Sequence, residues 1–228
     1  MARAISRSVA TGAQPHLAAV VTQSPVQVVW PDTMRLQHLL HAAAAEVLRD
    51  AGIGLAGLAA VLATQAQPYL EEACRLDWAA DGVSALGAEV EGSLMLRDDG
   101  GREREIRFRA DRVDVIDDSV RLTDYKTGKP VSQAKTVKTR QAHFLSDVES
   151  GKRLQAVAYV LGAHAAGAVS AEGQYLFLTP NLGDAVRRVG IRAADVAALA
   201  AFDKTARTVL QAWDTGSFFL EEVLAKHA

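Results

Sequence analysis

Cysteine is nearly absent from this chain, which has a single one, Cys74, among 228 residues. One thiol excludes an internal disulfide, and it also excludes an iron–sulfur cluster held by four cysteines. No apolar run reaches the roughly 18 residues that span a bilayer, and the apolar run at residues 17–21 is too short for a secretory signal. We therefore expect a cytoplasmic protein that does not enter a membrane.

The chain also lacks the phosphate-binding pattern G-x-x-x-x-G-K-[ST], so it contains no motor of the helicase type. Hydrophobic residues make up 49% and charged residues 23%, as in an ordinary globular protein. The net charge of −2 does not favour nucleic-acid binding, but residues 121–153 carry eight basic and only three acidic side chains. Such a segment is either a solvated loop or a surface along which a phosphate backbone runs.

Hydrophobic periodicity and turn residues predict an α/β fold. Strands are expected at 86–96, 106–116, 120–125 and 175–179, with a short additional one at 26–30. Helices are expected at 34–49, 152–165 and 193–213. Over residues 55–80 we expect two short helices with a break near Pro68. Over residues 130–150 we expect an irregular connection or a short helix. We divide the chain into a flexible N-terminal extension, residues 1–24, and a single domain, residues 25–228.

A predicted hairpin organises the chemistry of the chain. Its strands, 106–116 and 120–125, are joined by a tight turn at residues 117–119. The side-chain period of two puts Asp124 and Lys126 on the face of the second strand that also carries Leu122. A hairpin of this length can bring Asp111 beside Asp124. Two carboxylates and an ammonium group at the rim of a core can hold a hard divalent cation and a water molecule.

Three ordered motifs resemble those of the PD-(D/E)XK nuclease superfamily, and within it those of the RecB/AddB-type exonucleases. The first two are Ala110-Asp111-Arg112-Val113-Asp114 and Thr123-Asp124-Tyr125-Lys126-Thr127-Gly128-Lys129, and the third is Gln155-Ala156-Val157-Ala158-Tyr159. Arg109 departs from the family pattern, in which a glycine is usual. The resemblance implies a restriction-endonuclease-like αβββαβ core, with a mixed central sheet flanked by helices and, here, extra N-terminal helices. The iron–sulfur cluster that some relatives carry is excluded by the cysteine count.

The resemblance also implies metal-dependent hydrolysis of DNA, and it assigns a role to each of several residues. Asp111, Asp124 and the backbone carbonyl of Tyr125 would bind Mg²⁺ or Mn²⁺. His41 and Glu89 are further candidate ligands, and Lys126 would orient the attacking water. The candidate substrate-binding residues are Gln155, Tyr159, Lys129, Lys135, Lys138 and Arg140.

Several alternatives stay open at this point. His41 is equally a surface side chain of its helix, and Glu89 an exposed carboxylate of an edge strand. Asp111 and Asp124 could simply pair with Arg112 and Lys126. The chain could also be a catalytically silent DNA-binding module beside a helicase or helicase-like partner. Exonuclease or endonuclease action, and a role in DNA repair or in defence, are not separated by the sequence.

Overall fold

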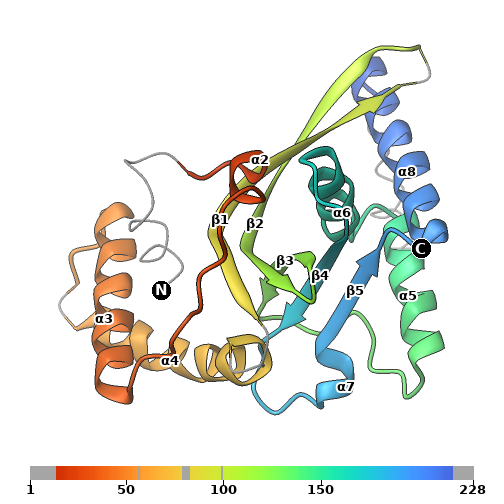
Figure 1. The fold of residues 1–228 in the computed structure, drawn as a ribbon. Helices are drawn as coiled ribbons and strands as arrows, with labels where there is room; N and C mark the ends of the chain where they lie inside the picture. Colours follow the sequence, from red (N-terminus) through yellow and green to blue (C-terminus); the bar gives the residue numbers. More distant parts are fainter. Residues whose placement is uncertain (1–13, 56, 79–82, 99, 218–228) are drawn as a thin grey trace, which may run out of the picture.

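The computed structural model describes residues 14–55, 57–78, 83–98 and 100–217. Their strands form one mixed sheet in the order β1-β2-β3-β4-β5 (Figure 1). The strands are β1 (Ser84–Arg97), β2 (Glu103–Ile116), β3 (Ser119–Lys126), β4 (Ala171–Phe177) and β5 (Arg188–Arg192). The first three form an antiparallel meander, β4 is parallel to β3, and β5 is antiparallel to β4. This arrangement confirms the predicted αβββαβ class with its mixed sheet.

The hairpin of β2 and β3 turns over two residues, Asp117 and Asp118, because Ile116 pairs with Ser119. Both turn residues have a positive φ, 47° and 61°. A two-residue turn with left-handed backbone at both positions matches the twist of the flanking strands, and aspartate tolerates that conformation better than most residues. The turn therefore fixes the register of the two strands that carry the central motifs.

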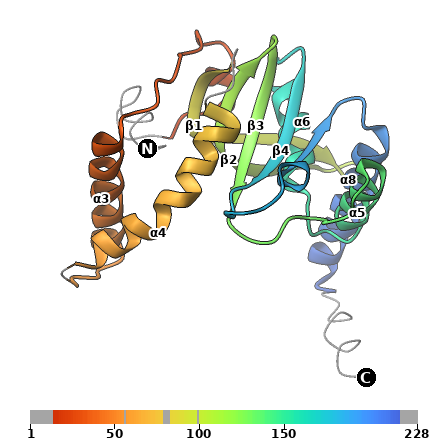
Figure 2. The ribbon, with the colours of Figure 1, turned by 90° about the horizontal axis from the view of Figure 1, so that it is seen from below.

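Helices lie on both sides of the sheet (Figures 1 and 2). The helices are α2 (Leu17–Val20), α3 (Thr33–Asp50), α4 (Leu58–Ala73), the π-helix η1 (Cys74–Trp78), α5 (Val137–Glu149), α6 (Gln155–Ala165), α7 (Asp184–Arg187) and α8 (Val196–Thr215). Helix α6 packs on the sheet face that carries Val113 and Leu122, and α5 and α8 pack beside it. On the opposite face, the Trp78 ring of η1 lies 3.9 Å from the guanidinium carbon of Arg112.

Two glycine contacts allow α6 to approach the sheet closely. A Cβ on Gly173 of β4 would lie 1.9 Å from the carbonyl oxygen of Ala156. A Cβ on Gly162 of α6 would lie 2.4 Å from the Phe108 ring. Larger side chains at these positions would push the helix outward, because neither neighbour leaves room for another carbon. The sequence thus places α6 directly against the strands that carry the acidic motifs.

The structure corrects several predicted elements. Helix α4 continues through Pro68 without the predicted break, since strong helix formers surround the proline. Of the two alternatives for residues 130–150, the helix is the one that forms, as α5 at residues 137–149, whereas β5 was not predicted. No strand forms over residues 26–30, where Val26 makes only an isolated bridge to Ala85. Within the described helices, none has the length and apolar composition that would cross a membrane.

Part of the N-terminal extension, predicted over residues 1–24 to be flexible, packs on the domain through α2. Leu17 and Val20 of α2 belong to the main core and are each 1% exposed. Proline 15 accepts a backbone hydrogen bond from Glu91 of β1. Residues 1–13 lie outside the described part of the chain. Burial of two aliphatic side chains on the α6 side of β1 explains why this short helix is held in place.

Candidate active site

One row of side chains crosses the sheet at the level of the acidic motifs. Asp124 of β3 pairs with Tyr175 of β4. Arg112 pairs with Thr123, which makes Asp111 and Asp124 the next facing residues of β2 and β3. Between the pairs Ala88–Arg112 and Val90–Ala110, Glu89 of β1 faces Asp111. By this register, Glu89, Asp111, Asp124 and Tyr175 lie at the same level of four neighbouring strands, and we call them the carboxylate row.

The structure brings together the three residues that the hairpin predicted. One carboxylate oxygen of Asp111 accepts a hydrogen bond of 2.7 Å from the backbone N–H of Tyr125, directly after Asp124. The Lys126 ammonium nitrogen lies 2.6 Å from an oxygen of Asp124. Arg112 pairs with Asp114 at 2.6 Å rather than with Asp111. Of the two pairings in the packing-only alternative, that of Asp111 with Arg112 is therefore not formed, whereas that of Asp124 with Lys126 is.

The carboxylate of Asp124 is costly to keep charged in this place. The residue is 5% exposed, and its pKa is raised because burial disfavours the carboxylate. Lys126 lowers the pKa of Asp124, and the negative charge of Asp111 raises it again. Asp111 and Asp124 supply hard oxygen donors, and the one nearby ammonium group balances only part of their negative charge. A divalent cation bound by these oxygens would neutralise the rest.

Glu89 occupies a strained position in this row. Its φ is +55°, a conformation that few residues other than glycine adopt. Its carboxylate lies 3.2 Å from the Arg109 guanidinium, so the side chain is paired within the strand pair. Unfavourable backbone conformations of this kind gather at functional sites. Glu89 therefore faces Asp111 along the sheet, with its own charge held by Arg109.

His41 is not brought to the carboxylates. It lies on the exposed surface of α3, which packs against α4 and extends away from the sheet (Figure 2). Among the residues that the structure describes, no group of three or more His, Cys, Asp or Glu side chains is placed to hold a metal ion. The protein donors at the row are thus the two aspartates, a set that suits Mg²⁺ because this ion keeps several water ligands.

Gln155 and Tyr159 bind the main chain just before Asp111. The Tyr159 hydroxyl donates a hydrogen bond of 2.7 Å to the carbonyl oxygen of Arg109, and the Gln155 amide donates to the Tyr159 oxygen at 2.8 Å. Tyr159 is fully buried, and burial together with the charges of Asp124 and Asp111 raises its pKa. The pair, predicted to hold substrate, therefore fixes strand β2 beside Asp111 in this structure.

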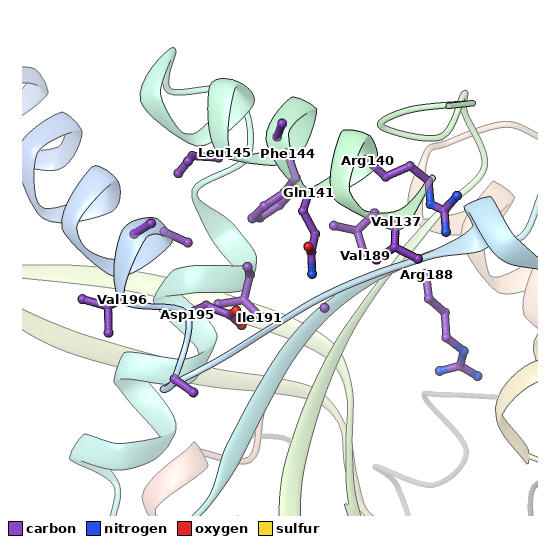
Figure 3. A pocket seen from close by; sticks show the side chains of 15 residues that line it. Val137, Arg140, Gln141, Phe144, Leu145, Arg188, Val189, Ile191, Asp195 and Val196 are labelled. Atoms are coloured by element: carbon purple, nitrogen blue, oxygen red, sulfur yellow. The ribbon is translucent and has the colours of Figure 1, made fainter. Parts of the chain in front are cut away.

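The predicted basic segment is largely exposed. Lys129, Lys135 and Lys138 reach solvent, whereas Arg140 donates to the backbone carbonyls of Ala134 and Lys135 at 2.9 and 3.1 Å. Arg140 also borders a groove of about 620 Å³ between α5, β5 and the start of α8 (Figure 3). None of the residues in the carboxylate row lines this groove. We therefore assign the candidate site to the row and not to the groove.

Two further residues, Tyr175 and Arg153, border the site and were not predicted from the sequence. The Tyr175 hydroxyl accepts a hydrogen bond of 3.3 Å from the backbone N–H of Ala156 at the start of α6, and burial raises the pKa of Tyr175 to about 12. The guanidinium carbon of Arg153 lies 5.4 Å from the centre of the Tyr175 ring. A usable signal for Arg153 was its place in the basic segment, two residues before Gln155. Tyr175 carried no such signal, because it reads as an ordinary strand residue.

A second set of charges lies across the sheet from the row. Asp77 of η1 is fully buried and accepts hydrogen bonds of 3.2 Å from the Arg188 guanidinium. The Tyr125 hydroxyl accepts from the Trp78 indole at 3.2 Å and donates to Asp77 at 3.4 Å. Tyr125 therefore joins both sides of the sheet, since its backbone N–H holds Asp111.

A family model described as the PD-(D/E)XK nuclease superfamily matches residues 3–223, which is nearly the whole chain. No curated protein matches the sequence. The matched region includes β1 to β5 and every residue of the carboxylate row.

Proposed function

Because the chain belongs to the PD-(D/E)XK nuclease superfamily, we propose that it is a deoxyribonuclease that depends on Mg²⁺ or Mn²⁺ and acts as a RecB/AddB-type exonuclease. The observation that carries the proposal is the meeting of Asp111, inside β2, with Asp124 and Lys126 at the end of the paired strand β3. Acidic oxygens beside an ammonium group match the needs of phosphodiester hydrolysis, in which negative charge builds on the phosphate.

Asp111 and Asp124 would hold the metal ion, with the Tyr125 backbone carbonyl as a third oxygen donor. A bound divalent cation polarises a phosphate oxygen and lowers the pKa of a coordinated water. His41 and Glu89 stay candidate ligands, and they would have to leave the positions they have in this structure. The support for the two aspartates is their shared row and the raised pKa of Asp124, which burial and the charge of Asp111 produce.

Lys126 would orient the attacking water and offset charge on the phosphate. Its ammonium group contacts Asp124 at 2.6 Å, so the side chain is already directed toward the site. Gln155 and Tyr159 would act by holding β2, and the lysines at 129, 135 and 138 would lie along the DNA backbone. We further propose that the protein works with a helicase or helicase-like partner, in DNA repair or recombination or in defence against foreign DNA.

The proposal is tested with end-labelled linear DNA and with circular DNA, each with Mg²⁺, with Mn²⁺ or with EDTA. We expect metal-dependent cleavage that needs a DNA end. Asp124→Asn and Lys126→Ala should each lower the rate on the order of a hundredfold or more, since each removes a charge that the transition state requires.

Two matched controls test whether the losses come from the site. Asp118→Asn removes an exposed carboxylate from the hairpin turn, and Lys204→Ala removes an exposed ammonium group from α8. Both should cleave like the unmodified protein. Cleavage that persists in EDTA, or in Asp124→Asn and Lys126→Ala, would exclude the proposed mechanism. Binding without cleavage would favour a silent DNA-binding module, and cleavage of circular DNA would identify an endonuclease.

A further inference from the structure

Arg153 lies beside the carboxylate row and has had no role so far. It precedes α6, and its guanidinium carbon lies 5.4 Å from the centre of the Tyr175 ring and 5.8 Å from that of Phe177. The Lys126 ammonium nitrogen lies 5.7 Å from the same Tyr175 ring centre. The two distances to this ring limit the separation of the cations to about 11 Å. A second positive group therefore accompanies Lys126 at the site.

The charge of Arg153 is only weakly compensated. Within the described residues, its ion pair is with Asp147, at 3.7 Å from the guanidinium Nε. Lys126, in contrast, lies 2.6 Å from Asp124. The side chain of Arg153 is 26% exposed, so its terminal nitrogens remain within reach of a ligand from solvent. Its field also reaches the row, where it helps to lower the pKa of Asp124 against the effect of burial.

We propose that Arg153 binds a backbone phosphate of the nucleic acid next to the scissile one, an inference that rests on the proposed nuclease function. A guanidinium group offers two parallel N–H donors that match phosphate oxygens, and it stacks on aromatic rings. Tyr175 and Phe177 are 2% and 1% exposed, so they form a rigid surface that orients the guanidinium before the ligand arrives. Phosphates follow one another every 3.4 Å or so along the axis of a strand, so Arg153 and Lys126 can serve nearby phosphates.

A purely structural role for Arg153 is the competing explanation. The side chain covers Tyr175 and Phe177 and pairs with Asp147 near the end of α5, which would link α5 to β4. In that case Asp147→Asn should reproduce the effect of losing Arg153. If Arg153 instead binds phosphate, Asp147→Asn should leave DNA binding unchanged or strengthen it, because the guanidinium loses its nearest competitor.

The experiment measures binding of a labelled single-stranded DNA oligonucleotide by fluorescence anisotropy, in EDTA, over a series of salt concentrations. The variants are Arg153→Gln, Arg153→Lys and Asp147→Asn, with Lys204→Gln as a control that makes the same charge change on α8. We expect Arg153→Gln to weaken binding about five- to tenfold and to lower the salt slope by about 0.7, the value for one contact to a single strand. Arg153→Lys should keep most of the slope, because the charge is retained.

The outcomes separate this inference from the nuclease proposal. Unchanged affinity and slope in Arg153→Gln, or an equal loss in Asp147→Asn or Lys204→Gln, would overturn the role of Arg153. Absence of DNA binding by the unmodified protein would overturn it as well. Binding that depends on Arg153 without any metal-dependent cleavage would refute only the nuclease proposal.

Discussion

Asp114 should make the stability of this protein fall as the pH rises. Its side chain is fully buried, and one carboxylate oxygen bonds the Arg112 guanidinium at 2.6 Å. The other oxygen has no hydrogen-bond partner among the described residues. Burial raises the pKa of Asp114 from 3.8 to about 7; Arg112 opposes this shift, and the charge of Asp77 adds to it. The folded protein therefore binds a proton in a pH range where the unfolded chain has released it.

The sign and size of the effect follow from this difference. Where the folded state holds more protons than the unfolded state, the free energy of unfolding decreases with rising pH. The loss begins near the unfolded pKa of 3.8 and is complete above the folded pKa of about 7. With these two values, the contribution of Asp114 falls by about 2.5 kcal/mol between pH 5 and pH 8.

The test is urea denaturation at pH 5 and pH 8 for the unmodified protein and for Asp114→Asn. The asparagine stays neutral and still offers an oxygen to Arg112, so its stability should lack this pH-dependent loss. The change in stability between the two pH values is then compared between the two proteins, and this comparison cancels the contributions of the other titrating groups. Asp118→Asn, in the exposed turn, should behave like the unmodified protein. An equal pH dependence in Asp114→Asn and the unmodified protein would refute the reasoning.

Two further predictions concern packing. Gly173→Ala should cost about 1–3 kcal/mol of stability and lower nuclease activity, because the added Cβ would displace α6 at the Ala156 carbonyl. Gly128→Ala is the control and should cost little, since the space around Gly128 is open. Thermal denaturation measures the stability of both variants, and cleavage assays measure their activity. Arg187→Met should lower the free energy of unfolding in urea by about 3 kcal/mol, because the buried guanidinium donates to three backbone carbonyls at 3.0–3.2 Å. Arg75→Met, at an exposed arginine, should cost less than about 1 kcal/mol. An equally small cost for Arg187→Met would contradict the prediction.

The central part of the site could be predicted because it is local in the chain. A two-residue turn fixes the register of β2 and β3, and the alternation of side chains then places Asp111 and Asp124 on one face. The pairing of Lys126 with Asp124 follows from the same alternation, since the two residues are two apart on β3. Nothing beyond the hairpin was needed for these positions.

Other features depend on contacts between distant segments, and these are not encoded in local patterns. The position of α3, and with it His41, depends on where α4 and η1 attach to the sheet, for example through Asp77 and Arg188, which are 111 residues apart. Strand β5 has only five residues, and although Val189 and Ile191 alternate and pack on the core, two apolar residues between arginines are too short a pattern to predict a strand. The left-handed conformation of Glu89 likewise shows only in the structure.

Tyr125 connects the candidate active site to η1, which follows the N-terminal helices α3 and α4. Its backbone N–H donates a hydrogen bond to Asp111, and its hydroxyl accepts one from Trp78 and donates one to Asp77. A protein that binds α4 and displaces η1 from the sheet would therefore change the spacing of the two aspartates without contacting either of them.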